Sequence, residues 1–278
     1  MDFYTTERVS ENITLIRSRM GELLYLIEGK KRAALVDTCV GAGYLRSLVE
    51  SLTDKPYIVL LTHGHVDHAP GAAEFDEVWL NEKDLPLYRR QCTLEERMGY
   101  MQACMGPHFS ELDRSSVLEP APDKEFMPLD DGDRFDLGGL HIDAYAMPGH
   151  TPGCMVFLIR ELRTLILGDA CNNSTFLFDD DAGYLDEYVG MLRNLRDRLA
   201  GTYDHVYLSH HDMETGTDIM DNVLEVCREA AEGKADDIPY DFMGHHAFIA
   251  NKCDERFRRE DGKCGNIIYS KEKLFKKC

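Results

Sequence analysis

The chain has 278 residues, of which 44% are hydrophobic, enough for one large domain or two small ones with a buried core. Its formal net charge of −19 at pH 7 argues against a nucleic-acid phosphate backbone as a general partner, although a local basic patch is compatible with it. No segment approaches 18 uninterrupted apolar residues, and residues 1–8 lack a basic region followed by an apolar stretch, so neither a membrane span nor a signal peptide is predicted.

The nine cysteines are odd in number, and none forms a Cys-x-x-Cys pair. In a chain with no export signal, this usage predicts reduced thiols and a cytoplasmic location instead of a disulfide framework. Composition and charge together favour a small-molecule substrate, with no nucleic acid and no membrane as partner. They leave assembly into a homo-oligomer open.

Strand-like runs dominate the first part of the chain. Three apolar segments separated by turn residues predict β-strands at residues 12–16, 23–27 and 33–37. Helical spacing of leucine and valine predicts a helix over residues 44–52. A further apolar run at residues 57–61 predicts a buried strand, which ends just before a cluster of polar residues.

Four metal-capable side chains follow this strand within six residues: His63, His65, Asp67 and His68. Gly64 removes a side chain at the point where two imidazoles must converge. His63 and His65 can reach one ion, while Asp67 and His68 can turn toward a second. Solvated loop histidines are the alternative, but the whole chain has only 11 histidines and three of them lie here. Imidazole and carboxylate suit zinc and related first-row metals, so the cluster predicts a metal site.

The spacing His-x-His-x-Asp-His after a strand resembles the metallo-β-lactamase superfamily of metallohydrolases. The resemblance implies an α/β fold, an αββα sandwich whose dinuclear metal site lies at one edge between two sheets. It also implies that Asp37, at the end of the third predicted strand, braces the metal-binding loop. An Asp in a turn or at a helix N-cap is the competing interpretation, and the sequence leaves the two open.

Residues 81–120 are the part of the chain least typical of the superfamily, and we interpret them as an inserted helical cap near the site. The predicted elements around them are a helix start at 71–75, a strand at 78–80 and helices at 85–90 and 94–105. Met98, Met101 and Met105 share one helical face. This spacing predicts a core-facing surface in preference to a substrate groove.

The second half of the chain resumes with strands, predicted at residues 135–137, 140–146, 154–159 and 164–167. Proline and glycine on both sides hold His150 in a loop at a strand end, and this Pro-Gly-His-Thr-Pro-Gly segment resembles the second motif of the superfamily. Asp169 directly follows an apolar strand, where an unpaired carboxylate would be costly to bury, so a cation partner is expected. The resemblance implies His150 as third ligand of the first metal and Asp169 as the carboxylate that bridges both metals.

A helix is predicted over residues 184–200, and a strand at 206–208 leads to two adjacent histidines. The resemblance implies His210 as third ligand of the second metal, with His211 as the alternative. A last helix is predicted over residues 217–231.

Residues 233–278 are polar, and we predict a C-terminal extension that packs on a catalytic domain of residues 1–232. A structural zinc in this extension is the alternative, although the spacing of its candidate ligands fits no standard zinc finger. Those candidates are His245, His246, Cys253, Cys264 and Cys278.

Taken together, the motifs predict a hydrolase with two divalent metal ions, most simply zinc. The predicted ligands are His63, His65, Asp67, His68, His150, Asp169 and His210. Iron is disfavoured because His65 stands where the flavodiiron branch of the superfamily carries an acid. A water between the two ions would lose a proton near neutral pH and attack a small ester, thioester or lactone. Asp169, which holds the ions, and Asp67, which can relay a proton to the leaving group, are the predicted catalytic residues.

Two other functions stay open. A metal-dependent phosphodiesterase or nuclease would use the same ligands, and the net charge of −19 makes it less attractive. A non-catalytic metal-binding module would keep the site only for structure. Structural zinc normally has a closed shell of four ligands, which differs from two ions that share a carboxylate.

Overall fold

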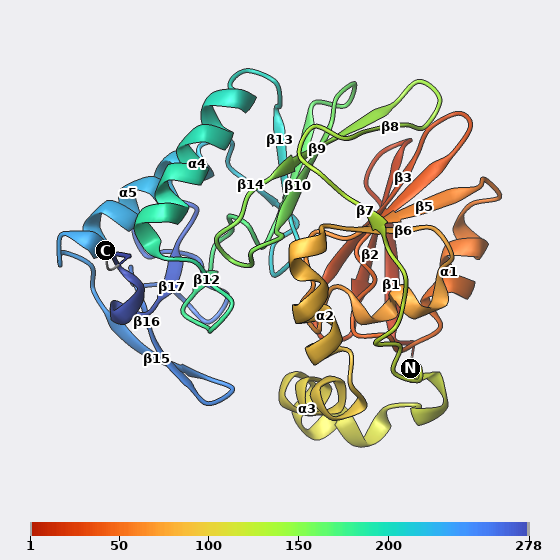
Figure 1. The fold of residues 1–278 in the computed structure, drawn as a ribbon, viewed down its shortest axis with the longest axis horizontal. Coiled ribbons are helices and arrows are strands. Elements are labelled where there is room, and N and C mark those ends of the chain that lie inside the picture. The colour runs from red at the N-terminus through yellow and green to blue at the C-terminus, as the bar shows by residue number, and fades with distance from the viewer. Residues whose placement is uncertain (1, 277–278) are drawn as a thin grey trace. The chain divides into compact units, whose positions relative to one another are not determined.

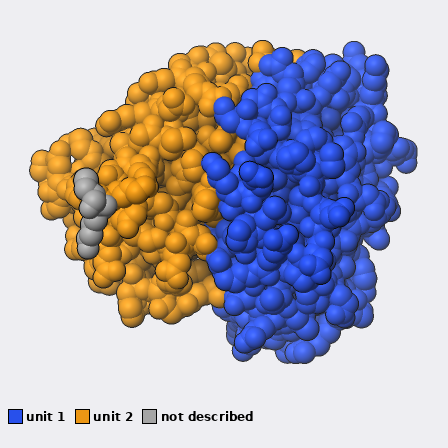
Figure 2. Space-filling view, viewed as in Figure 1, with its two compact units in different colours: residues 1–143 blue, residues 144–278 orange. Residues whose placement is uncertain are grey.

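The computed structural model describes residues 2–276. The chain divides into two compact units, residues 1–143 and residues 144–278, which Figure 2 colours blue and orange. Each unit has its own cluster of buried apolar side chains. Among the described residues, no helix combines the length and the apolar character that crossing a membrane requires.

The first unit is built on a seven-stranded sheet (Figure 1). Its strands, in spatial and chain order, are β1 (Tyr4–Arg8), β2 (Ile13–Ser18), β3 (Leu23–Glu28), β4 (Ala33–Val36), β5 (Tyr57–Leu60), β6 (Val78–Leu80) and β7 (Met127–Pro128). Strands β1 to β4 pair antiparallel, and β4 to β7 pair parallel. Helix α1 (Leu45–Leu52) supplies the crossover that the parallel pair β4 and β5 requires.

The parallel pairing brings two predicted functional segments to one edge of this sheet. Val36 lies opposite Leu60 in the register of β4 and β5. The carboxyl ends of parallel strands meet at the same edge, so Asp37 and the histidine cluster leave the sheet side by side. Strands β3, β4 and most of β5 are buried on both faces, which explains their almost continuous apolar sequence.

The region 81–120 is helical, as the sequence predicts. Its α-helices are α2 (Leu85–Gln91) and α3 (Leu94–Met105), and its 3₁₀-helices are Glu82–Asp84, Gly106–Glu111 and Arg114–Ser116. Met101 and Met105 are buried in the core of the first unit and Met98 packs against it, which confirms the predicted core face. Where the sequence predicted the start of a helix at 71–75, a 3₁₀-helix (Pro70–Glu74) forms, and it leads into β6 instead of an α-helix.

Helix α3 is tied to the loop after β4 by a buried arginine. The Arg97 guanidinium donates hydrogen bonds to the backbone carbonyls of Val40 (2.7 Å), Gly41 (2.6 Å) and Leu118 (2.8 Å). Its burial lowers the pKa of the guanidinium, and the three carbonyls satisfy donors that would otherwise be costly to bury. At the start of the helix, the Thr93 side chain accepts from the backbone of Glu96, as an N-cap does.

The second unit holds a sheet with the strand order β14-β13-β11-β10-β9. These strands are β9 (His141–Ala146), β10 (Met155–Ile159), β11 (Thr164–Gly168), β13 (His205–Leu208) and β14 (Glu214–Thr215). The amino-terminal half of β9 lies in the first unit, where it pairs with β8 (Arg134–Asp136). Strands β11 and β13 are parallel, with Gly168 opposite Leu208, so Asp169 and His210 follow neighbouring strand ends.

Two helices and a small sheet complete the second unit. Helices α4 (Leu185–Leu199) and α5 (Ile219–Ala231) lie side by side (Figure 1) and bury their apolar faces in its core. The small sheet has the order β12-β17-β16-β15, formed by β12 (Thr175–Leu177), β15 (Ile238–Phe242), β16 (His245–Ile249) and β17 (Ile267–Tyr269). These strands were not predicted from the sequence. Strands β12 and β17 have only three residues each, and β15 contains a proline, Pro239, which is unusual inside a strand.

Candidate metal centre

The loop after β5 places His63 and His65 so that two ring nitrogens face each other. His63 Nε2 lies 3.0 Å from His65 Nδ1, and both rings are buried. Two nitrogens this close, from different rings, can both bind a single ion if the rings move slightly apart. The sequence predicted this pair for one metal, and the local geometry suits that role.

The backbone of this loop is held by the segment that precedes α2. The Gly64 backbone N–H donates to Asp84 Oδ2 at 2.9 Å, and a Cβ at residue 64 would lie 2.8 Å from the Asp84 carbonyl oxygen. Only glycine therefore fits this close approach without a shift of the backbone. The His68 backbone N–H donates to the His65 carbonyl at 3.0 Å, which turns the chain within the motif.

Asp37 braces this loop, as the resemblance implied. Its Oδ1 accepts from the Thr62 backbone N–H at 2.7 Å, and its Oδ2 lies 2.8 Å from His68 Nδ1. This contact orients the His68 ring and leaves Nε2 directed away from Asp37. The N-cap alternative is wrong, because the N-cap of α1 is Tyr44. Asp37 holds a left-handed backbone conformation (φ 64°), a strained geometry for a non-glycine residue that its hydrogen bonds offset.

Asp67 and His68 offer ligand atoms to a common point. Asp67 Oδ2 lies 3.5 Å from His68 Nε2. The same carboxylate oxygen accepts a hydrogen bond from the Tyr100 hydroxyl at 3.1 Å. The arrangement agrees with the prediction that these two residues turn toward a second ion.

Tyr100, on α3, is a site residue that the sequence analysis missed. Its hydroxyl lies 2.8 Å from Glu22 Oε1 and 3.1 Å from Asp67 Oδ2, so one phenol stands between two carboxylates. Burial, followed by the charges of Asp67 and Glu22, raises the pKa of Tyr100 well above its usual value, and the group stays a proton donor. The Ser18 hydroxyl donates to Glu22 in turn. Tyr100 belongs to no sequence motif. Its only local mark is its place on α3, one helical turn after the buried Arg97.

In the second unit, His150 is oriented by a backbone carbonyl. Its Nδ1 lies 2.9 Å from the carbonyl oxygen of Phe176 in β12, which fixes Nδ1 as the donor and leaves Nε2 as a ligand atom. The loop passes tightly over α4, because a Cβ on Gly149 would lie 2.3 Å from the Tyr188 ring, and Gly149 has φ 152°. This explains the glycine beside the predicted ligand.

Asp169 presents one oxygen to two imidazoles. Its Oδ2 lies 3.1 Å from His210 Nε2 and 3.8 Å from His150 Nε2. Its Oδ1 accepts from the Asn172 side-chain amide at 3.2 Å, which holds the carboxylate in this orientation. The two imidazoles are those that the sequence assigned to different metals, so the geometry within this unit suits a bridging carboxylate.

His210 and His211 point to different neighbours. His210 Nε2 faces Asp169, whereas the His211 ring lies 5.1 Å from the ring of Phe257, between centroids. Burial lowers the pKa of His211, and the neighbouring His210 lowers it further. His210 is therefore the histidine that fits the predicted ligand position.

The donor set fits a metal. In each unit, the predicted ligands that face one another bring ligand atoms within 4.8 Å: His63 with His65, Asp67 with His68, and Asp169 with His210. Buried carboxylate oxygens and imidazole nitrogens that converge in this way are costly to desolvate, and a bound cation would offset that cost. First-row divalent ions favour this combination of ligands.

The remaining predicted candidates do not gather into a further metal group within residues 2–276. His246 pairs with Asp241, Cys253 lies in an isolated bridge opposite Arg259, and the Cys264 thiol contacts Asn222. Cys278 lies outside the described residues. The described part of the tail thus gives no support to the structural zinc alternative.

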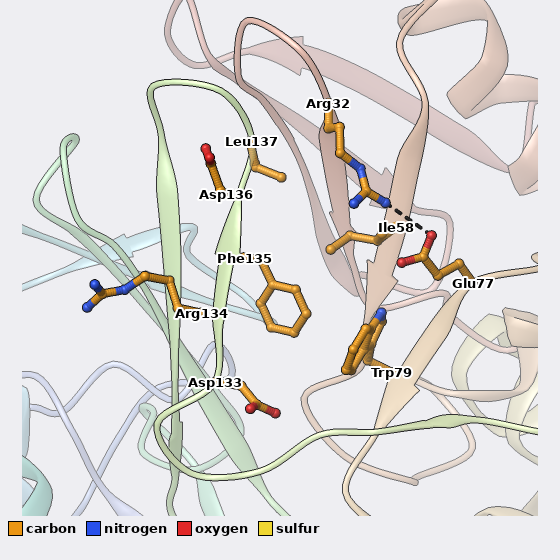
Figure 3. A pocket seen from close by; sticks show the side chains of 9 residues that line it. All are labelled: Arg32, Ile58, Glu77, Trp79, Asp133, Arg134, Phe135, Asp136 and Leu137. Carbon is orange, nitrogen blue, oxygen red and sulfur yellow. Dashed lines mark hydrogen bonds and ion pairs between the residues drawn. The ribbon is translucent and has the colours of Figure 1, made fainter.

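A pocket of about 360 Å³ in the first unit is separate from these ligands (Figure 3). Arg32 and Glu77, which stand just before β4 and β6, form an ion pair of 3.0 Å at its side. Trp79 and Phe135 meet edge to face with ring centroids 4.9 Å apart. None of the predicted ligands lines this pocket, and its ion pair belongs to the amino ends of the parallel strands, opposite the edge that carries the histidine cluster.

Comparison with known proteins places the chain among hydrolases. Hydroxyacylglutathione hydrolase GloC of Haemophilus influenzae is 27% identical over 191 residues, which are 65% of this chain and 80% of the relative. Acyl-coenzyme A thioesterase MBLAC2 of Homo sapiens is 22% identical over 212 residues, 70% of this chain and 76% of the relative. An uncharacterized protein of Mycobacterium tuberculosis is 33% identical over 174 residues, 60% and 74% of the two chains.

Solved structures agree on the fold. A metallo-beta-lactamase from Pontibacter korlensis superposes with a TM-score of 0.57 at 17% identity, over 80% of this chain and 97% of its own. The sec-alkylsulfatase Pisa1 from Pseudomonas sp. gives a TM-score of 0.61 at 16% identity, over 83% and 43% of the two chains. The mixed α/β fold that the sequence predicted is thereby confirmed.

The sequence profile of the Metallo-beta-lactamase superfamily matches residues 19–210, more than half of the chain. This range begins before β3 and ends at His210, and it includes every predicted metal ligand. With its His and Asp side chains positioned for metal binding and its hydrolase relatives, the chain belongs to the metallo-beta-lactamase superfamily and is a hydrolase.

Proposed function

We propose that the predicted ligands together bind two zinc ions. His63, His65 and His150 would hold the first ion, and Asp67, His68 and His210 the second, with Asp169 shared. The proposal rests on the position of Asp169 Oδ2, which lies near both His150 Nε2 and His210 Nε2 within one unit. His65 at the second motif position, where the flavodiiron branch of the superfamily carries an acid, favours zinc over iron.

The proposed reaction is hydrolysis of a small thioester, with an ester or lactone as a related substrate. The zinc ions, when bound, would supply Lewis-acid activation of water and of the acyl carbonyl. The printed names of two relatives support the thioester, since one is a hydroxyacylglutathione hydrolase and the other an acyl-coenzyme A thioesterase.

The chain's own groups would orient the reactants and move one proton. The Asn172 amide would hold the Asp169 carboxylate in the orientation that addresses both ions. Asp37 would hold His68 in one tautomer. Asp67 would receive a proton from the attacking water and pass it to the leaving thiolate, while Tyr100 keeps that carboxylate in place.

We also propose that residues 81–120 act as a helical cap and residues 233–278 as an extension of a catalytic domain formed by residues 1–232. The Tyr100 contact to Asp67 supports the first assignment. The pairing of β17 with β12, next to the carbonyl that orients His150, supports the second.

A substrate panel tests the proposal. Zinc-loaded protein is assayed against acyl thioesters, aryl esters, lactones, bis-aryl phosphodiesters and oligonucleotides, with Asp169→Asn as the matched variant. Thioester turnover is expected, and Asp169→Asn should lower it by on the order of a hundredfold or more, because a misplaced reactant costs about that much. Preference for phosphodiesters or oligonucleotides, with rates that fall steeply as salt rises, would refute the acyl-hydrolase proposal.

A further inference from the structure

The small sheet of the second unit carries an aromatic face. Cross-strand register places Tyr240 opposite Ala247 and Phe242 opposite His245, and side chains two residues apart on a strand share a face. The register continues from Ile249 to Ile268 on β17, and from Ile268 to Phe176 on β12. We call the side chains on this side, together with the Phe257 ring that packs against them, the aromatic face: Phe176, Ile238, Tyr240, Phe242, His245, Ala247, Ile249, Phe257 and Ile268.

The rings of this face form a connected surface. Phe176 lies 5.4 Å from Phe242 and 6.2 Å from Tyr240, between ring centroids. The rings of Tyr240 and Phe242 are nearly parallel, with an interplanar angle of 11° and centroids 6.2 Å apart. Phe257 meets Tyr240 edge to face at 6.1 Å. These contacts build a broad apolar wall and not a set of isolated rings.

The opposite side of the same sheet is the one that packs into the core of the unit. Tyr269 is buried there, and Phe248 packs against that core. The aromatic face is less filled, because Phe176, Tyr240, Phe242 and Phe257 all keep part of their surface exposed. A sheet that buries one side and leaves aromatic rings half exposed on the other has apolar surface available to a ligand.

The aromatic face is continuous with the metal ligands of its own unit. The Phe176 carbonyl accepts the hydrogen bond that orients His150. At its other side, Phe257 lies against His211, the neighbour of His210. The aromatic face thus extends from Phe176, which orients His150, to Phe257, which contacts the neighbour of His210. A substrate whose reactive carbon lies at these two ligands would have this apolar surface next to it.

We propose that the aromatic face binds the apolar acyl chain of the substrate, as a subsite beside the metal ligands. The proposal rests on the acyl-hydrolase function proposed above, and it assigns substrate selection to Phe242, Tyr240 and Phe257. An alkyl chain suits this wall, because its rings offer apolar contact and no Asp, Glu, Lys or Arg belongs to the face. Its histidine, His245, lies at the end of the face, opposite Phe242. A polar acyl group would gain nothing from it.

The expected effect follows from buried area. Each methylene that leaves water contributes about fourfold in binding. Phe242 can cover two to three methylenes, so its removal should cost on the order of tenfold or more in affinity for a long acyl chain. A two-carbon acetyl group is too short to reach the ring and should be insensitive.

The test compares octanoyl and acetyl thioesters of one thiol in the wild type, Phe242→Ala, Phe242→Met and Phe257→Ala. His246→Ala is the control, because His246 lies on the same sheet but points to the opposite side, opposite Asp241. Binding of a non-hydrolysable octyl thioether to the metal-free protein, measured by calorimetry, gives a readout apart from turnover. Metal content and the unfolding midpoint show whether each variant folds. If Phe242→Ala does not fold, Phe257→Ala takes its place in the comparison.

In Phe242→Ala, the ratio of octanoyl to acetyl kcat/KM should fall about tenfold, with a parallel loss of thioether affinity. His246→Ala should leave both unchanged, and Phe242→Met should restore most of the ratio. An unchanged ratio and unchanged thioether binding would overturn the proposal, as would a change of oligomeric state alone, which would make the face an interface between copies. If the wild type hydrolyses no thioester but binds the thioether through Phe242, the proposed reaction is wrong and the apolar subsite stands.

Discussion

Replacement of Tyr100 by phenylalanine separates the role of its hydroxyl from that of its ring. The hydroxyl is the donor between Glu22 and Asp67, at 2.8 Å and 3.1 Å. A hydrogen bond to a charged group contributes about 1.5–3 kcal/mol, so Tyr100→Phe should destabilise the metal-free protein by about that amount. Asp67 would also lose a fixed orientation, and loss of such an outer contact typically lowers metal affinity about 10- to 100-fold.

Tyr88→Phe is the matched control. Tyr88 is also buried in the first unit, but its hydroxyl donates at 2.9 Å to the backbone carbonyl of Ala121, a neutral acceptor with no link to the ligands. Its loss should cost about 1 kcal/mol and leave metal affinity unchanged. Chemical unfolding of the metal-free protein measures the free energy of unfolding. Titration of zinc against a chelator measures the affinity of the protein for the more weakly bound ion.

Binding of two ions by Tyr100→Phe as tightly as by the wild type would refute this role of the hydroxyl. Equal losses of stability and of metal affinity in both tyrosine variants would refute it too, since the position between two carboxylates would then have no particular effect. A lower kcat with unchanged metal content would support a role for Tyr100 in orienting Asp67 during the reaction.

Three further outcomes are expected. His210→Ala should lower the metal content from two ions toward one, whereas His211→Ala should leave two; elemental analysis that gave the reverse would exchange their roles. Asp169→Asn should fold with an unchanged unfolding midpoint in the metal-free state but lose its second ion. Glu28, although burial alone would raise its pKa, has a lowered pKa through hydrogen bonds from Arg8, Thr53 and Lys55. Its stabilisation is therefore present above the unfolded-state pKa and lost as pH falls through the folded one. Glu28→Gln should be less stable than the wild type at pH 7, with a difference that shrinks below about pH 4.5 in acid-unfolding curves.

The local ligand motifs were predictable, because they are short and tied to strand ends. His63 and His65 stand two residues apart, and an apolar strand before them fixes where the loop starts. Helix α3 was predicted at its observed bounds, Leu94–Met105, and its Met98, Met101 and Met105 recur at helical spacing. Features set by sequence neighbours are the ones that sequence reasoning reaches.

Features set by distant neighbours were not predictable. Glu22 and Tyr100 are 78 residues apart, and neither belongs to a motif. Strand β12 has three residues and pairs with β17 about ninety positions later, so no local pattern marks it. The choice between the two roles of Asp37 likewise depended on Thr62 and His68, which only the folded chain brings to its carboxylate.

The pairing of β12 with β17 also sets the order in which this protein can mature. Beyond the strand ladder, the Gly265 backbone N–H donates to Asn173 Oδ1 at 2.8 Å, and Asn266 exchanges backbone hydrogen bonds with Asn172 and Thr175. The segment that carries the Phe176 carbonyl is thus held by residues that are synthesised about ninety positions after it. A chain released after residue 232 would contain every predicted ligand and still lack the partner strand that secures the orientation of His150. Binding of the proposed metal at full affinity should therefore require that β17 has been synthesised, and nascent chains stalled before β17 should bind the metal weakly.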